Sequence, residues 1–212
     1  MKIELAGTTV HLLPQKALLL PDTTTLVLGD LHLGKAMHFR KAGISFPQVS
    51  ALRDYQVLHQ LMEAHKPTNV LFLGDLFHSI HNSEWLQFEA FILDYPDTRF
   101  TLIKGNHDIL KKEVYGRLPL EIVPHQLILE NLIFSHEPLN DVAPGKINVA
   151  GHIHPGCMLR GLGKQYLGLP CFYCKDNVFL LPAFGHLTGL QIMAHTKGAE
   201  IFAILPDKVL KL

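Results

Sequence analysis

The stretch TLVLGDLH at residues 25–32 is a continuous apolar run that ends at a glycine followed by Asp30 and His32. Two similar stretches follow along the chain, VLFLGD at 70–75 and RFTLIKGNHD at 99–108. Apolar runs of this length without polar alternation are typical of strands that are buried on both faces, as in a sheet covered by helices. We therefore expect three buried strands, each followed by a glycine and a polar side chain.

Two amphipathic segments separate these strands. PQVSALRDYQVLHQLMEAHK at 47–66 has apolar residues at helical spacing, with Pro47 suited to a first turn and Pro67 to a stop. SEWLQFEAFILDY at 83–95 has an aromatic stripe at helical spacing, and Ser83 is suited to an N-cap. The first 110 residues thus predict a β-α-β-α-β order with mainly parallel strands and right-handed crossovers.

The second half of the chain predicts short strands separated by turns. The strand-like stretches are EIVPHQLILE (121–130), NLIFSHE (131–137), INVAGHIH (147–154), QYLGLPCFY (165–173), NVFLLPAF (177–184), TGLQIMAH (188–195) and AEIFAILP (199–206). Such density is consistent with a second sheet packed on the first. Without a linker or repeat in the sequence, we expect a single α/β domain over residues 1–212, built from two packed sheets.

The composition excludes several classes of protein. Hydrophobic residues make up 48% and charged residues 18%, which excludes a disordered chain. Nineteen basic and nineteen acidic residues give a formal net charge of zero, which excludes a globally basic surface that coats DNA. Three cysteines, an amino terminus without an apolar leader and no apolar run of membrane-spanning length predict a cytoplasmic protein that does not enter a membrane.

Side chains that can bind metal ions follow the predicted strands. They are Asp30, His32, Asp75, Asn106, His136, His152 and His154. Residues two apart in an extended segment point the same way, so Asp30 with His32, and His152 with His154, can each reach one ion. Glycines before four of these positions allow tight turns beyond the strand ends, where open α/β sheets bind their ligands.

The chemistry of this set favours two metal ions. Two carboxylates, one amide oxygen and four imidazoles suit Mn²⁺, Fe²⁺ or Zn²⁺ and do not resemble a closed structural zinc site. Seven ligands are too many for one transition ion. They suit two ions about 3.5–4 Å apart that share a bridging carboxylate, an arrangement that clamps the attacking and leaving oxygens of a phosphoryl displacement.

The ordered blocks at 30–32, 74–75, 105–108, 136 and 151–154 resemble the calcineurin-like metallophosphoesterases. The resemblance implies a four-layer α/β/β/α sandwich and hydrolysis of phosphodiesters by a metal-activated hydroxide, with Mn²⁺ the favoured ion. It implies that Asp30, His32 and His154 hold one ion, that Asn106, His136 and His152 hold the other, and that Asp75 bridges both. His78 departs from the family, many members of which carry an aspartate there.

The resemblance also assigns catalytic roles in the GNHD block. It implies that His107 protonates or hydrogen-bonds the leaving oxygen and that Asp108 orients this imidazole, beside the ligand Asn106. Lys35, His38 and Arg40 are candidate substrate-binding residues, because they follow the first ligand block in a basic stretch.

A narrower resemblance concerns GDLHLGKAMHFRKAGISFP (29–47) and LPAFGHLTG (181–189), which are similar to the bacterial DNA ligase-associated metallophosphoesterases. It implies a role in DNA repair beside an ATP-dependent DNA ligase and a helicase, with single-stranded or frayed DNA as substrate. Two alternatives remain open: a nucleotide phosphodiesterase or pyrophosphatase that acts on small molecules, and an interaction scaffold that has lost catalysis.

Overall fold

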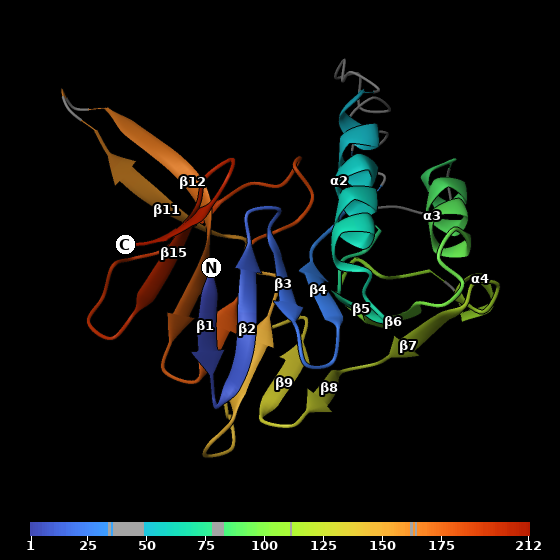
Figure 1. Ribbon diagram of the computed structural model, residues 1–212, viewed down its shortest axis with the longest axis horizontal. Coiled ribbons are helices and arrows are strands. Elements are labelled where there is room, and N and C mark those ends of the chain that lie inside the picture. Colours follow the sequence, from blue (N-terminus) through green and yellow to red (C-terminus); the bar gives the residue numbers. More distant parts are fainter. Residues whose placement is uncertain (34, 36–48, 78–82, 111, 162, 164) are drawn as a thin grey trace.

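The computed structural model describes residues 1–33, 35, 49–77, 83–110, 112–161, 163 and 165–212 of the chain. At its centre are two packed mixed sheets (Figure 1). The first has the strand order β1-β2-β3-β4-β5-β6-β7, and the second the order β14-β11-β12-β13-β10-β9-β8, with β15 paired to β12 and β16 to β15. The predicted α/β class with two packed sheets is confirmed.

The first sheet combines an antiparallel meander with a parallel half. Its strands are β1 (Lys2–Leu5), β2 (Thr8–Leu13), β3 (Ala17–Leu20), β4 (Thr25–Gly29), β5 (Asn69–Leu73), β6 (Arg99–Ile103) and β7 (Leu120–Val123). Strands β1 to β4 pair antiparallel, whereas β4 to β7 pair parallel. The β-α-β-α-β prediction is confirmed for β4, β5 and β6. It is wrong for the stretch 121–130, which was expected in the second sheet but contributes β7 to the first sheet and β8 to the second. Strands β1 to β3 were not predicted from the sequence.

The helices are α2 (Val49–His65), α3 (Ser83–Leu93) and the short α4 (Lys112–Tyr115). Both long helices therefore lie within the predicted ranges, although Pro47 and the Ser83 side chain lie outside the described residues. All three helices pack on the outer face of the first sheet. None of the helices in the described ranges has both the length and the apolar character that a membrane crossing requires.

The second sheet consists of β8 (Gln126–Leu129), β9 (Leu132–Ser135), β10 (Ile147–Ala150), β11 (Pro155–Arg160), β12 (Tyr166–Lys175), β13 (Val178–Leu180), β14 (Gln191–Ile192), β15 (Glu200–Ile204) and β16 (Val209–Lys211). Strand β10 pairs parallel with both β9 and β13. The outer face of the second sheet carries a separate apolar cluster that includes the buried Cys157 and Cys171. The second outer helical layer implied by the resemblance is not among the elements of the described residues.

Alternate residues of the buried strands face two different cores. In β4, Leu26 and Leu28 pack against α2 and α3, whereas Val27 packs against the second sheet. Phe134 of β9 and Val149 of β10 meet Val27 in the core between the sheets. This double burial explains the continuous apolar runs, and it fixes where the ends of β4, β9 and β10 lie relative to one another.

Candidate metal centre

Five predicted ligands adopt the left-handed backbone conformation. The φ angles are 54° for Asp30, 49° for His32, 48° for Asp75, 65° for His152 and 54° for His154. The interpretation of the two i, i+2 pairs as extended segments is therefore wrong, because β4 and β10 end before them. Non-glycine residues in this region are strained by about 1–3 kcal/mol each, and they persist only where the surroundings hold them. Strained turns, rather than extended strands, bring these side chains together.

Hydrogen bonds hold the loops against one another. The His32 amide donates to the Asp75 carbonyl at 2.9 Å, and the His107 amide donates to Asp75 Oδ1 at 2.9 Å. Across the two sheets, the His152 amide donates to Asp30 Oδ2 at 2.8 Å. The two aspartates therefore tie the loops together as well as facing the site.

The glycines of the blocks serve different needs. Of the glycines before Asp30, Asp75, Asn106 and His152, Gly74 alone has a positive φ, at 74°. A Cβ atom on Gly74 would also collide with the His136 ring. A Cβ atom on Gly151 would lie 2.6 Å from Asp30 Oδ2, so that glycine permits a close approach rather than a turn.

Asp30, His32 and His154 form a first group of ligand atoms that lie within 4.8 Å of one another. The two imidazoles face each other with their Nε2 atoms 3.4 Å apart, and His154 Nε2 lies 3.5 Å from Asp30 Oδ1. Asp30 is fully buried, and its Oδ1 accepts no hydrogen bond from the described part of the chain. Because a buried carboxylate oxygen without a donor is costly, this group fits a cation.

Asp75, His136 and His152 form a second group of the same kind. His136 Nδ1 lies 2.9 Å from the Leu73 carbonyl, which can only accept, so Nδ1 is the donor and Nε2 is the nitrogen whose lone pair can bind a metal ion. Nε2 lies 2.9 Å from Asn106 Oδ1 and 3.1 Å from His152 Nδ1. A lone pair facing an amide oxygen at that distance fits a cation between them.

Asp75 belongs to the second group and also faces the first. Its Oδ1 is 3.5 Å from His136 Nε2 of the second group. Its Oδ2 is 3.9 Å from His32 Nε2 of the first group. Its two oxygens thus face different groups, which is the position that a bridging carboxylate needs.

His107 lies beside the groups and faces solvent. Its side chain is 42% exposed, and its Nε2 is 4.0 Å from Asp75 Oδ2. Asp108, in contrast, is buried, and its carboxylate accepts hydrogen bonds from the backbone amides of Leu76, Phe77 and Gly105. Burial raises the pKa of Asp108 to about 6, although these three amides act against the shift. Asp108 therefore ties the GNHD loop to the GDLF loop, and its expected role in orienting His107 stays a prediction.

Among the predicted substrate-binding residues, Lys35 belongs to the described chain and is half-buried. Burial lowers the pKa of Lys35, and the Asp75 and Asp30 carboxylates act in the opposite direction, so its ammonium group lies within electrostatic range of the site. His38, Arg40 and His78 lie outside the described residues.

One side-chain contact near the site was not predicted from the sequence. His186 Nδ1 lies 3.0 Å from both carboxylate oxygens of Asp54 on α2. The two residues are 132 positions apart, so no local pattern could have indicated their contact.

Comparison with known proteins agrees with this geometry. The chain matches the family of calcineurin-like phosphoesterases over residues 23–177. Its fold is similar to that of a Pseudomonas putida nuclease, MPE, with a TM-score of 0.81 and 25% sequence identity over 100% of this chain and 99% of that chain. A phosphoesterase from E. coli, Yfce, has a TM-score of 0.48 and 14% identity over 89% of this chain and 97% of that chain. No curated protein matches the chain.

The matched region contains all five ligand blocks, and the structure gathers those blocks at one edge of the two sheets. Members of the matched family use divalent metal ions, for which the two ligand groups are suited. The chain therefore belongs to the calcineurin-like phosphoesterase family and is a metal-dependent phosphoesterase.

Proposed function

We propose that the protein is a phosphodiesterase that uses two divalent ions, most favourably Mn²⁺, and cleaves single-stranded or frayed DNA. One observation carries the proposal: two groups of ligand atoms share one edge of the sheets, with Asp75 between them. Diester hydrolysis needs charge neutralisation on the oxygens around phosphorus, and a paired site of oxygen and nitrogen ligands supplies it.

In this proposal, Asp30, His32 and His154 hold one ion, and Asn106, His136 and His152 hold the other. The bound ions supply positive charge to the phosphoryl oxygens and lower the pKa of water toward neutrality. The chain positions them through ligands that are largely buried, with Asp30 and Asp75 at 0% and 2% exposure. Buried ligands have few alternative positions, so they would hold the ions, and with them a bound phosphate, in a defined arrangement.

His107 would donate a proton or a hydrogen bond to the leaving oxygen. Its ring is open to solvent on one side and lies near Asp75 on the other, so a substrate bound at the ions can reach it. Lys35 would add positive charge near the phosphoryl group. His38 and Arg40 are kept as proposed substrate contacts on the basis of the sequence alone.

The choice of DNA as substrate is supported by the similar structure named a nuclease and by the resemblance to ligase-associated enzymes. A chain with zero net charge is poorly suited to tight non-specific binding of a duplex, which requires many neutralised phosphates. A flexible strand can bend one phosphate into the site. We include in the proposal a role in DNA repair beside an ATP-dependent ligase and a helicase, and a cytoplasmic location.

A small-molecule phosphodiesterase is the second candidate, because the same ligand groups would act on any diester. The scaffold alternative is disfavoured, because all seven ligands and His107 are retained. Hydrolysis assays with Mn²⁺ distinguish the candidates, using bis-p-nitrophenyl phosphate, p-nitrophenyl phosphate, 2′,3′-cyclic nucleotides, single-stranded DNA and duplex DNA. We expect diesters to be preferred over monoesters and single strands over duplex. Efficient hydrolysis of a nucleotide monoester or pyrophosphate without cleavage of any DNA would contradict the DNA proposal.

A further inference from the structure

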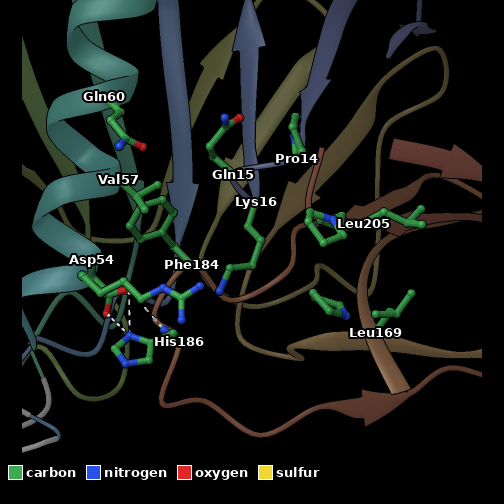
Figure 2. Close-up of a pocket in the computed structure, with 14 residues that line it drawn as sticks. Pro14, Gln15, Lys16, Asp54, Val57, Gln60, Leu169, Phe184, His186 and Leu205 are labelled. Atoms are coloured by element: carbon green, nitrogen blue, oxygen red, sulfur yellow. Dashed lines mark hydrogen bonds and ion pairs between the residues drawn. The ribbon is translucent and has the colours of Figure 1, made fainter. Parts of the chain in front are cut away.

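A cavity of about 470 Å³ lies beside the metal centre and plays no part in the chemistry described above (Figure 2). Its walls come from five segments of the chain: the β2–β3 turn, α2, β12, residues 184–186 and the end of β15. Lys16 of the turn lines the cavity together with Arg53, Asp54 and His186. Figure 2 shows the Lys16 side chain extending toward the part of the cavity that holds Asp54 and His186.

The cavity and the metal centre share a wall. Strand β3 pairs antiparallel with β4, with Leu18 opposite Val27, so the turn before β3, which holds Lys16, lies toward the end of β4 that precedes Asp30. The Phe184 amide donates to the Gly29 carbonyl at 2.8 Å. The next amide, that of Gly185, donates to the Asp30 carbonyl at 3.2 Å. Phe184, which lines the cavity, is therefore hydrogen-bonded to the segment that carries Asp30.

The charges around the cavity do not balance. Burial lowers the pKa of Lys16, the Asp54 carboxylate acts in the opposite direction, and Arg53 lowers the pKa further, so both charged groups lie within electrostatic range of the Lys16 ammonium. Burial is the larger cause and lowers that pKa to about 8, so the ammonium is charged at neutral pH but poorly hydrated. The carboxylate of Asp54 accepts hydrogen bonds from the His186 amide and ring. Lys16 and Arg53 thus face one carboxylate, Asp54, which is already hydrogen-bonded to His186. A cavity with this excess of positive charge favours an anion.

The remaining surface of the cavity is apolar. Val57 of α2, Leu169 of β12 and Leu205 after β15 contribute aliphatic side chains to the wall. A cavity of this volume is large enough for one nucleotide, and its combination of an apolar wall with a few cations is typical of sites for such ligands. A guanidinium binds phosphate oxygens in a fork, and an ammonium adds a point charge.

We propose that this cavity binds a second phosphate of a polynucleotide strand whose scissile phosphate lies at the metal centre. Lys16 and Arg53 hold that second phosphate, and the sugar and base attached to it lie against Val57, Leu169 and Leu205. The inference rests on the proposed diesterase function and sharpens it, because it assigns a strand of several nucleotides, rather than a small diester, as the favoured substrate.

The test compares two substrates in three variants. Arg53→Gln and Lys16→Gln each remove one cation from the cavity. Arg99→Gln is the matched control, because Arg99 is an exposed arginine at the start of β6, the end of the strand opposite the site. For each variant, kcat/KM is measured with Mn²⁺ for a single-stranded 12-mer and for bis-p-nitrophenyl phosphate, which has one phosphate only.

We expect the ratio of kcat/KM for the 12-mer to that for the small diester to fall about tenfold in Arg53→Gln and in Lys16→Gln, mainly through KM. The slope of log KM against log salt should decrease by about 0.7 for the phosphate contact that is lost. Arg99→Gln should keep the wild-type ratio. An unchanged ratio in Arg53→Gln, which alters an exposed side chain, would overturn the proposal even if Lys16→Gln failed to fold.

A binding measurement separates this inference from the proposed function. Fluorescence anisotropy of a labelled 12-mer is measured with Asp75→Asn protein, which is expected to be inactive, and with the double variant that also carries Arg53→Gln. Weaker binding by the double variant supports the cavity, whether or not the wild-type protein hydrolyses any diester. Equal binding overturns it. Inorganic phosphate is the second probe, and full displacement of the 12-mer by equimolar phosphate would assign the cavity to a free anion and overturn the strand assignment.

Discussion

The two sheets end their strands at the same edge but contribute different ligands. The first sheet supplies Asp30, Asp75 and Asn106, which offer oxygens, together with one imidazole, His32. The second sheet supplies imidazoles from the ends of β9 and β10. Each ligand group mixes both sources, since His154 joins Asp30 and His32, whereas His136 and His152 join Asp75. Neither sheet alone can form either group, so the site depends on the packing between them.

The largest expected effect comes from replacing the residue between the two groups. Asp75→Asn keeps the shape but removes the charge that both groups face, so it should lower kcat by more than about 10³-fold. Metal analysis should find reduced occupancy of both ions. His152→Ala is the matched comparison, because it alters the second group alone. Loss of only one ion in Asp75→Asn would contradict the shared position of Asp75.

A substitution of His107 should lower the rate of hydrolysis without loss of metal binding, because His107 belongs to neither ligand group. His107→Gln should retain both ions and lower kcat by about 10²–10⁴-fold, the usual size of a general-acid contribution. The loss should be smaller for p-nitrophenolate than for an alkoxide leaving group, since the former needs no proton. Equal losses for both leaving groups would argue against proton donation by His107.

A side chain at Gly74 is expected to weaken the packing between the two sheets and lower the stability of the protein. Gly74→Ala combines a φ of 74° with a collision against the His136 ring, and urea unfolding should show a loss of about 2–4 kcal/mol in stability. Gly7→Ala is the control, because Gly7 has a φ of 80° but no atom within 4 Å of the added carbon. That variant should lose about 1 kcal/mol. Equal losses in the two variants would show that the His136 contact is unimportant.

Removal of metal should loosen the same contact. Each group takes ligands from both sheets, so a bound ion holds the sheets together and binds the folded state only. Ions at about 100 times their Kd then stabilise the folded state by about 2.7 kcal/mol. Chelation by EDTA should then lower Tm by about 5–10 °C in a chain of this length. The shift should be much smaller in Asp75→Asn. A Tm that does not respond to EDTA in the Mn²⁺-loaded wild-type protein would be inconsistent with ligands shared between the sheets.

The sequence predicts β4, β5 and β6 of the parallel half, together with the candidate ligand residues that follow them, because both are local signals. A continuous apolar run such as 25–29 must be buried on both faces, and a polar residue after it must lie at the sheet edge. The amino-terminal meander is harder to predict, because β1 and β3 have only four residues each. Such short segments carry weak periodicity.

Two features of the site could not be predicted for physical reasons. The left-handed conformations of Asp30 and His154 are imposed by the surrounding loops, since the intrinsic preference of these residues is against it. The contact between Asp54 and His186 is formed by tertiary packing alone, because α2 and the segment after β13 lie far apart in the sequence. Local patterns identify the ligands, but only the packed sheets fix their geometry.

Anomalous diffraction from crystals of the Mn²⁺-loaded protein tests the central claim most directly, because it locates each ion and its ligands. The account predicts two ions about 3.5–4 Å apart. Asp30, His32 and His154 should bind one, Asn106, His136 and His152 the other, and the Asp75 carboxylate should bridge them. A single ion in a closed tetrahedral site, or two ions without Asp75 between them, would contradict it.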